Sequence, residues 1–230
     1  MTLVDRMEHY NVPGVSIAVI NKDEIEWSKG YGTLEVWSNK PVTHDTLFQA
    51  GSIGKSLTAT ATMHFVEEGY LSLDENVNDK LVSWKVPENR FTKKENVTLR
   101  RLLSHSAGMT VGGFRGYSEG EQIPDLLQIL DGKSPANNKP IRVDKMPGKE
   151  FRYSGGGFQV VQQLLEDVQD EPFALIMQET ILRPSGMTSS AYELSLPQDR
   201  KDIAAIAHNV NGQPAPGKWH NLACFGAGGG

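Results

Sequence analysis

One serine–lysine pair in the sequence has the spacing of a nucleophile and its activating partner. Ser52 and Lys55 are separated by two residues and follow Gly51. If a helix begins at Ser52, its positive end favours a serine alkoxide, and Lys55 lies one turn away on the same face. A desolvated lysine there can accept the serine proton or hold a second base in its anionic form. The spacing alone is weak evidence, because about one such pair is expected by chance in this composition.

The same segment also resembles the end of a phosphate-binding loop. Gly54, Lys55 and Ser56 match the last residues of that motif, but Gln49 stands where its first glycine is required. The nucleotide-binding interpretation is therefore disfavoured.

A second candidate element is Tyr153, which precedes three consecutive glycines at residues 155–157. Neighbouring cations can make a tyrosine a general base by lowering its pKa from about 10, and glycines let the backbone approach a substrate closely. The alternative is a helix-entry loop with a packed tyrosine. Ser154 could itself be a nucleophile, but Arg152 occupies a position where the nucleophile elbow requires glycine.

The remaining reactive side chains favour structural roles. His64 and Glu67 could share a metal on one helix face, but no second pair has matching spacing. His105 at a helix end is expected to make structural hydrogen bonds. Cys224 is the single cysteine, which excludes an intrachain disulfide, and it is expected to be a buried small side chain. We therefore predict no metal and no cofactor.

Apolar spacing and turn residues predict a β-hairpin followed by helices. The hairpin is expected over residues 13–37, with Val15, Ile17 and Val19 on its inner face. Helices are expected from Ser52 to Gly69 and over residues 99–103, 124–130, 158–168 and 172–182. Leu126, Leu127 and Leu130 are expected to face inward, and residues 131–150 to form a long surface excursion.

The composition limits the function classes. The chain has 230 residues, 38% of them apolar, and a net charge of −5, so it has no global field that attracts nucleic acid. No run approaches the roughly 20 apolar residues of a membrane span. The charged start lacks the apolar stretch of a signal peptide, which predicts a cytoplasmic protein unless a leader was removed.

Taken in order, six stretches resemble the serine β-lactamase and penicillin-binding-protein superfamily, in particular its class C β-lactamase-like esterases and peptidases. They are residues 12–19, 47–56, 68–74, 97–109, 147–157 and 182–188. The resemblance implies an α/β fold of the α+β type, with an antiparallel sheet flanked by helices and an all-helical region. We expect the chain to have three parts. Residues 1–50 form the N-terminal part of the α/β domain, residues 51–200 form the helical region, and residues 201–230 return towards the α/β domain.

By this resemblance Ser52 is the acylated nucleophile, Lys55 its partner, and Tyr153 the base or proton relay. Gly155 and Gly156 are implied to bind substrate, and the backbone N–H of Ser52 to be one oxyanion donor. The sequence departs from the family at Gly155, where the family has an asparagine that binds a substrate amide. The family's third element, Lys-Thr-Gly or His-x-Gly on a late strand, is absent.

These features predict a serine hydrolase, most simply a carboxylesterase, whose partner is a small acyl ester or amide. A β-lactamase or D-alanyl carboxypeptidase is the alternative within the family, and a non-catalytic sensor or an inactive fragment is the alternative outside catalysis. Because an isolated hairpin is marginal in water, the sheet is expected to be completed from outside the chain. A C-terminal part, a homo-oligomer or a partner segment could supply the missing strands.

Overall fold

The protein is described by a computed structural model that covers residues 1–118, 120–193, 196, 198–218 and 226–229. The chain divides into two compact units. The first unit comprises Met1–Gln49 and Ser195–Asn221, and the second comprises Ala50–Leu194 and Leu222–Gly230. The two units are labelled unit 1 and unit 2 below.

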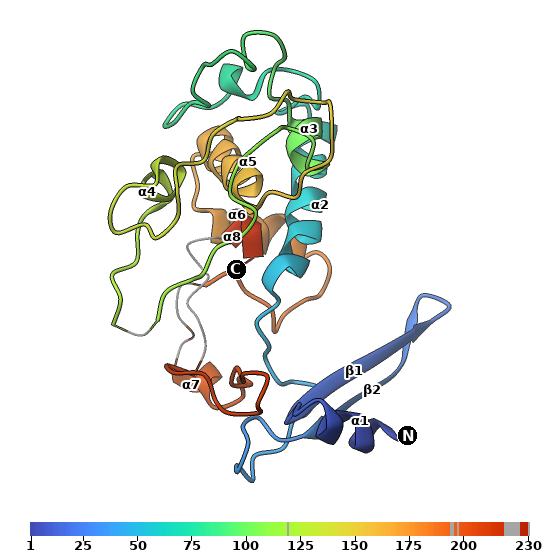
Figure 1. The fold of residues 1–230 in the computed structure, drawn as a ribbon. Helices are drawn as coiled ribbons and strands as arrows, with labels where there is room; N and C mark the ends of the chain where they lie inside the picture. The colour runs from blue at the N-terminus through green and yellow to red at the C-terminus, as the bar shows by residue number, and fades with distance from the viewer. Residues whose placement is uncertain (119, 194–195, 197, 219–225, 230) are drawn as a thin grey trace. The chain divides into compact units, whose positions relative to one another are not determined.

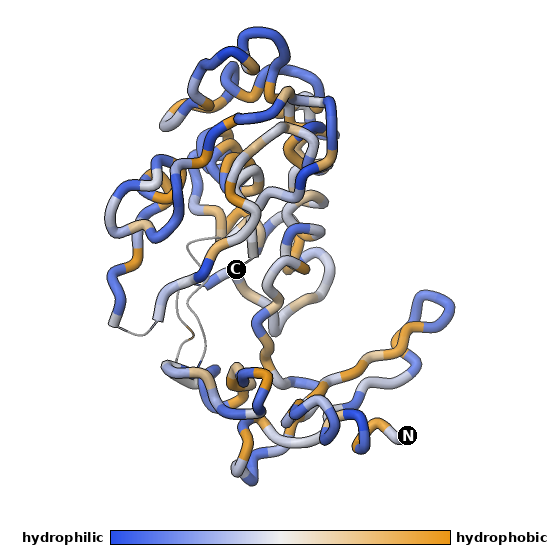
Figure 2. Tube along the Cα trace, in the orientation of Figure 1, coloured by the Kyte–Doolittle hydropathy of each residue, from blue (hydrophilic) through white to orange (hydrophobic). Residues whose placement is uncertain are grey.

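The hairpin of unit 1 confirms the alternation in the sequence. Strands β1 (Gly14–Asn21) and β2 (Glu24–Gly32) pair in antiparallel register (Figure 1). The turn between them places Lys22 and Asp23 at φ angles of 51° and 64°, as a two-residue turn that matches the strand twist requires. Figure 2 shows β1 largely in the hydrophobic colours. In the part of the chain that the structure describes, this two-stranded ribbon is the only sheet.

The helices described in unit 1 are short. Helix α1 (Leu3–His9) begins at Thr2, whose hydroxyl accepts a hydrogen bond from the backbone of Asp5 while the Asp5 carboxylate accepts one from the backbone of Thr2. This reciprocal arrangement is a capping box. The second helix, α7, spans Gln198–Lys201.

Unit 2 is helical and is built around one long helix, α5, which packs against α3, α4, α6 and α8. The helical elements of unit 2 are η1 (Gly51–Ile53), α2 (Gly54–Glu67), η2 (Val77–Asp79), α3 (Leu99–Leu103), α4 (Leu126–Asp131), α5 (Gly155–Gln169), α6 (Phe173–Met177), the π-helical turn η3 (Gln178–Leu182) and α8 (Gly226–Gly229). Its core contains Ala61, Leu102, Ile129, Leu130, Val160, Val161, Leu164 and Leu165.

Three details of unit 2 correct the expectations from sequence. Leu127 is 41% exposed, and Ile129 takes the inward position instead. Helix α5 begins at Gly155, three residues before the expected start. In the expected surface excursion over residues 131–150, Asp131 still belongs to α4 and no helix or strand follows it, but Ile141 and Val143 are buried in the core. The excursion is therefore partly a core-forming segment.

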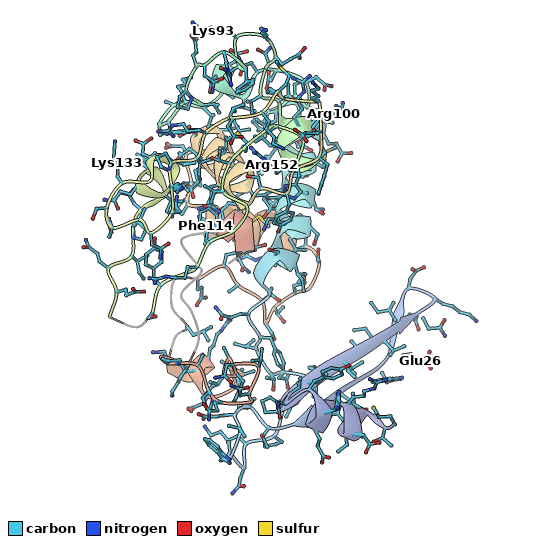
Figure 3. The ribbon with its side chains drawn as sticks, in the orientation of Figure 1. Glu26, Lys93, Arg100, Phe114, Lys133 and Arg152 are labelled. Atoms are coloured by element: carbon cyan, nitrogen blue, oxygen red, sulfur yellow. The ribbon has the colours of Figure 1, made fainter. Side chains whose placement is uncertain are left out.

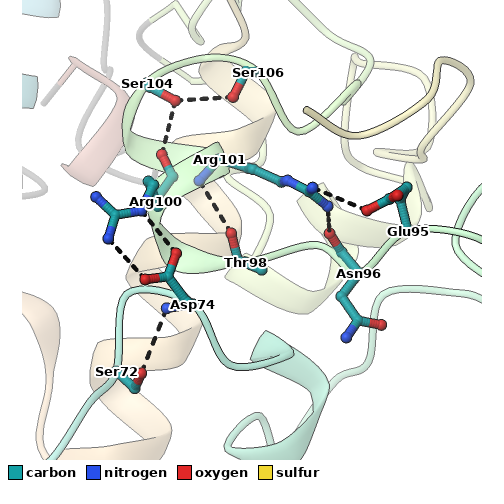
Figure 4. A network of polar contacts seen from close by, with 9 residues as sticks. All are labelled: Ser72, Asp74, Glu95, Asn96, Thr98, Arg100, Arg101, Ser104 and Ser106. Carbon is teal, nitrogen blue, oxygen red and sulfur yellow. Dashed lines mark hydrogen bonds and ion pairs between the residues drawn. The ribbon is translucent and has the colours of Figure 1, made fainter. Parts of the chain in front are cut away.

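A surface network anchors α3 (Figure 4). The side chain of Thr98 caps the helix by accepting a hydrogen bond from the backbone of Arg101. The Arg100 guanidinium makes two bonds of 2.7 Å to the Asp74 carboxylate, and Arg101 pairs with Glu95 at 2.9 Å. Bidentate pairing fixes the geometry as well as the charge. The network thereby joins α3 to the segments that contain Asp74 and Glu95.

Candidate active site

The serine and lysine predicted to react lie at the start of α2. Ser52 is exposed within η1, and Lys55 is only 8% exposed in the first turn of α2. The Lys55 Nζ atom lies 3.1 Å from the Ser52 Oγ atom and donates a hydrogen bond to it. A buried ammonium is thus held against an accessible hydroxyl, which is the geometry an activated serine needs.

Tyr153 approaches the same hydroxyl from the segment that precedes α5. Its phenolic oxygen lies 2.8 Å from the Ser52 Oγ atom, and the Lys55 Nζ atom lies 5.2 Å from the centroid of its ring. The structure therefore brings Ser52, Lys55 and Tyr153 together within unit 2, although about 100 residues separate the tyrosine from the other two. The Tyr153 oxygen at 2.8 Å and the Lys55 Nζ atom at 3.1 Å are both within hydrogen-bonding reach of the Ser52 hydroxyl.

The surroundings lower the pKa of Tyr153 below its ordinary value. Partial burial is the largest single influence and raises this pKa. It is outweighed by the hydrogen bonds with Lys55 and Ser52 and by the positive charge of Lys55. These groups stabilise the phenolate relative to the phenol. A larger fraction of Tyr153 is therefore ionised, and able to accept a proton, than of an isolated tyrosine at the same pH.

A third contact of Lys55 was not found from the sequence. The Lys55 ammonium also donates a hydrogen bond to the backbone carbonyl of Gly228 in α8. The α8 backbone is held in turn by Gln162 of α5, whose Oε1 atom accepts a hydrogen bond from the Ala227 N–H at 3.1 Å. The Gln162 amide donates to Glu166 at 3.1 Å. A relay of side chains on α5 therefore positions the carbonyl that binds Lys55.

Helix α8 approaches α5 closely, so that a side chain at Gly228 would have to displace the amide of Gln159. A Cβ atom at Gly228 would lie 2.5 Å from the amide nitrogen of Gln159. Gln159 is fully buried, and neither its amide nitrogen nor its amide oxygen has a hydrogen-bond partner among the described residues. Gln159 and Gln162 interrupt the apolar face of α5. These two polar residues are the signal in the sequence that this face contacts a polar group, here the backbone of α8.

His105 packs against the ring of Tyr153 and accepts a hydrogen bond from the next residue. The backbone N–H of Ser154 donates to the His105 Nδ1 atom at 3.1 Å, and the two rings of His105 and Tyr153 lie 4.4 Å apart between centroids. Burial, followed by the charge of Lys55, lowers the pKa of His105. The histidine is therefore neutral at neutral pH and acts as a hydrogen-bond acceptor, in agreement with the structural role expected for it.

Ser154 occupies a capping position. Its hydroxyl donates to the Thr110 carbonyl at 2.7 Å and accepts from the Gly157 N–H at 2.9 Å, and the residue is 2% exposed. This is an N-cap for α5 and explains why the helix begins before the apolar pattern. The hydroxyl of Ser154 is thus committed to the fold and is closed to a substrate.

The two glycines predicted to bind substrate lie in different surroundings. A Cβ atom at Gly155 would lie 3.2 Å from both the Gly112 carbonyl oxygen and the ring of Phe114. A Cβ atom at Gly156 would lie 2.8 Å from the Thr110 carbonyl oxygen and 3.1 Å from Ile141. Gly156 is therefore required by core packing, whereas Gly155 lies beside an aromatic ring two residues from Tyr153.

The other candidates do not join this site. The ring of His64 packs on Phe65 at 5.5 Å between centroids. No group of three metal-binding side chains occurs among the described residues. Cys224 lies outside the described part of the chain. Of the helices that the structure describes, none has the length and apolar character needed to cross a membrane.

A model of the Beta-lactamase family matches residues 2–230, and the chain therefore belongs to this family. Among curated relatives, an unguisins hydrolase of Aspergillus campestris is 28% identical over 198 residues, which is 82% of this chain and 35% of the relative. Penicillin-binding protein 4 of Amycolatopsis lactamdurans is 27% identical over 216 residues, covering 92% of this chain and 53% of the relative.

The octameric penicillin-binding protein homologue from Pyrococcus abyssi is similar in structure, with a TM-score of 0.67 and 26% identity. The alignment covers 98% of this chain and 54% of that homologue. The fold is thus the β-lactamase fold, with helices and a small, incomplete antiparallel sheet. The chain spans about a third to a half of the length of these relatives.

Proposed function

We propose that this chain carries the acylation site of a serine hydrolase that cleaves carboxylic esters. The observation that supports the proposal most strongly is the convergence of Lys55 and Tyr153 on the Ser52 Oγ atom, at 3.1 and 2.8 Å. Each group alone titrates far from neutral pH, but a lysine and a tyrosine that share protons can remove a serine proton near neutrality.

In the proposed reaction the Ser52 Oγ atom bonds to the ester carbonyl carbon as its proton passes to Tyr153, with Lys55 stabilising the phenolate. The carbonyl electron pair moves onto oxygen, where the Ser52 N–H is one proposed donor. When the carbonyl re-forms, the bond to the alcohol oxygen breaks, and that oxygen takes up the proton. Water then attacks the acyl-enzyme by the same route, which releases the acid and restores Ser52.

The experiment is covalent labelling with a fluorophosphonate, read by intact mass and peptide mapping. We expect one adduct on Ser52 and none in Ser52→Ala. Ser56→Ala is the matched control, because Ser56 is also exposed and lies four residues further along the chain, in the first turn of α2, and it should label normally. An adduct mapped to Ser154 or Cys224 would contradict the assignment.

A β-lactamase or D-alanyl carboxypeptidase is the second candidate, favoured by the similarity to a penicillin-binding protein. Gly155 argues against it, because an amide substrate would leave polar groups unpaired where the family has asparagine, at a cost of about 5- to 150-fold in rate. Short p-nitrophenyl esters should therefore be turned over far faster than nitrocefin. Efficient nitrocefin hydrolysis would favour the second candidate.

The surroundings of Gly155 determine which variant best distinguishes an esterase from a β-lactamase. An asparagine at residue 155 would press against the Phe114 ring, which lies 3.2 Å from its Cβ position. Gly155→Asn combined with Phe114→Ala should therefore narrow the gap between ester and β-lactam more than Gly155→Asn alone. A non-catalytic sensor would label on Ser52 without turnover in either assay.

Assembly is proposed only from a relative. The Pyrococcus abyssi homologue is octameric, and we propose that the complete protein also forms a homo-oligomer. Light scattering coupled to size-exclusion chromatography tests this, and a monomeric mass across the accessible concentration range would contradict it.

A further inference from the structure

His105 binds the backbone on both sides of Tyr153. Its carbonyl oxygen accepts a hydrogen bond from the Arg152 N–H at 2.8 Å, and its Nδ1 atom accepts one from the Ser154 N–H at 3.1 Å. The ring of His105 also packs against the Tyr153 ring, with 4.4 Å between their centroids. The Arg152 side chain, labelled in Figure 3, pairs with the Asp144 carboxylate. The segment that presents the phenol is therefore held at three points, two of them on one histidine.

The backbone of His105 has a conformation that favours glycine. Its φ angle is 55°, which lies in the left-handed region. The His105 N–H donates to the Leu102 carbonyl at 3.1 Å, and the Ser106 N–H donates to the Arg101 carbonyl at 2.8 Å. These two bonds form a Schellman motif at the end of α3, and glycine is the usual residue at its left-handed position. A histidine there indicates that the ring serves a purpose other than ending the helix.

We propose that His105 is a positioning residue of the acylation site, which holds the Tyr153 phenol at the Ser52 hydroxyl while its own ring is neutral. The inference rests on the proposed function, in which Tyr153 accepts the serine proton. Only a neutral ring can accept a hydrogen bond at Nδ1, because both nitrogens of a protonated imidazole are donors. Protonation of His105 therefore breaks the bond to the Ser154 N–H and loosens one side of the clamp.

Protonation of this ring also changes the charge around the site. The Lys55 ammonium acts on the ring from α2, and the Tyr153 phenol packs on it from the segment before α5. The rings of Phe151 and Phe158 pack against it as well, at 5.9 and 5.2 Å between centroids. A charged imidazole would repel the Lys55 ammonium in these half-buried surroundings. Acid should thus weaken the site through His105 as well as through Tyr153.

The test measures the rate of fluorophosphonate labelling of Ser52 between about pH 5 and about pH 8. His105→Gly suits the left-handed backbone but removes the ring and its acceptor, so labelling at neutral pH should slow by at least about tenfold. His105→Asn tolerates the same backbone, and its side-chain oxygen can accept from the Ser154 N–H without titrating. This variant should therefore restore most of the rate that His105→Gly loses.

The shape of the pH profile separates positioning from stability. In the wild type, the slope of log rate against pH should steepen from about one towards about two below pH 6.5, because His105 takes up a proton in addition to Tyr153. In His105→Asn the slope should stay at about one, since only Tyr153 titrates. Circular dichroism at each pH shows whether the proteins remain folded over the range.

The matched control is His64→Asn, the same substitution at an exposed histidine of α2 that packs on Phe65 outside the site. Its rate and slope should match the wild type. If Ser52 labels but His105→Gly reacts as fast as the wild type, the clamp is wrong while the proposed function stands. His105→Asn preserves the test should His105→Gly fail to fold, because a slope as steep as that of the wild type would also overturn the clamp. If the wild type does not label Ser52 at any pH, the proposed function fails and this inference fails with it.

Discussion

The apolar residues of helix α5 in unit 2 are buried much more completely than those of the hairpin in unit 1. Along α5, eleven consecutive residues from Gly155 to Leu165 are buried. In the hairpin, all of whose residues the structure describes, Val15, Ile17 and Val19 are only half-buried and no residue of either strand is buried. The site therefore rests on a packed helical core, whereas the sheet has an apolar face without a cover in the described chain.

The candidate catalytic residues all lie in the well-packed unit, unit 2. Ser52, Lys55, Tyr153 and the α8 carbonyl that binds Lys55 all belong to unit 2. The geometry of the proposed acylation site is thus set by contacts within unit 2, and these residues make no use of the two strands.

The largest expected effect compares the two cores directly. Leu164→Ala, at a position 1% exposed in α5, should lower the free energy of unfolding of unit 2 by about 2–5 kcal/mol, because it removes buried methyl groups and leaves a cavity. Ile17→Ala in the half-buried hairpin should cost about 1 kcal/mol. Urea unfolding followed by circular dichroism measures both. Equal losses would show that the hairpin is packed as tightly as α5.

The second effect concerns the relay that holds α8. Gln162→Leu leaves the buried N–H of Ala227 without its acceptor, which should move the Gly228 carbonyl and slow fluorophosphonate labelling of Ser52 by about tenfold. It should also shift the pH dependence of labelling, because Lys55 loses a fixed partner. Gln163→Leu is the matched control, since Gln163 is bonded to Asp167 at 3.0 Å on the same helix. Equal slowing in both variants would reduce the role of Gln162 to stability alone.

Much of the fold could be predicted because local patterns and tertiary structure agree. The alternation in β1, the long helix that follows Ser52 and the short helix over residues 99–103 all appear as expected. Leu127 was placed wrongly because a capping box at Asp125 sets where α4 begins, and that start rotates Ile129 inward. In a helix of six residues, a shift of start by one or two positions changes which side chains face the core.

The site was harder to predict where distant segments meet. Local spacing singles out Ser52 and Lys55, and the glycine run at residues 155–157 singles out Tyr153, but only the family resemblance joins the three residues into one site. The carbonyl of Gly228 could not be found, because α8 has the sequence Gly-Ala-Gly-Gly, which has weak helical propensity. Packing against α5 and the bond from Gln162 hold it in place. Such long-range contacts override propensity and leave little trace in the local sequence.

The third prediction uses the titration of His105. Its folded-state pKa is lowered by burial and by the charge of Lys55, so the unfolded chain binds a proton more readily. The stabilisation from the neutral ring is fully present above the unfolded pKa of about 6.5 and is lost as pH falls through the folded pKa. His105→Gln cannot titrate, so the wild type should lose stability relative to this variant as the pH falls below the unfolded pKa of about 6.5. Thermal unfolding at matched pH measures it, and parallel pH curves would contradict it.

The smallest expected effect concerns the ion pair between Asp74 and Arg100 on the surface of unit 2. It tests whether surface ion pairs contribute to the stability of this unit. Asp74→Asn removes the bidentate pair with Arg100, whose two side chains are 67% and 57% exposed. Its hydrogen bond with Arg100 lowers the pKa of Asp74 despite some desolvation, so any stabilisation exists above its unfolded pKa and disappears as pH falls through the lower folded pKa. Solvent screens an exposed pair, so the Tm at neutral pH should fall by only about 1–3 °C, with unchanged labelling of Ser52. A loss as large as that of Leu164→Ala would mean that the polar network shown in Figure 4, more than the core around α5, holds unit 2 together.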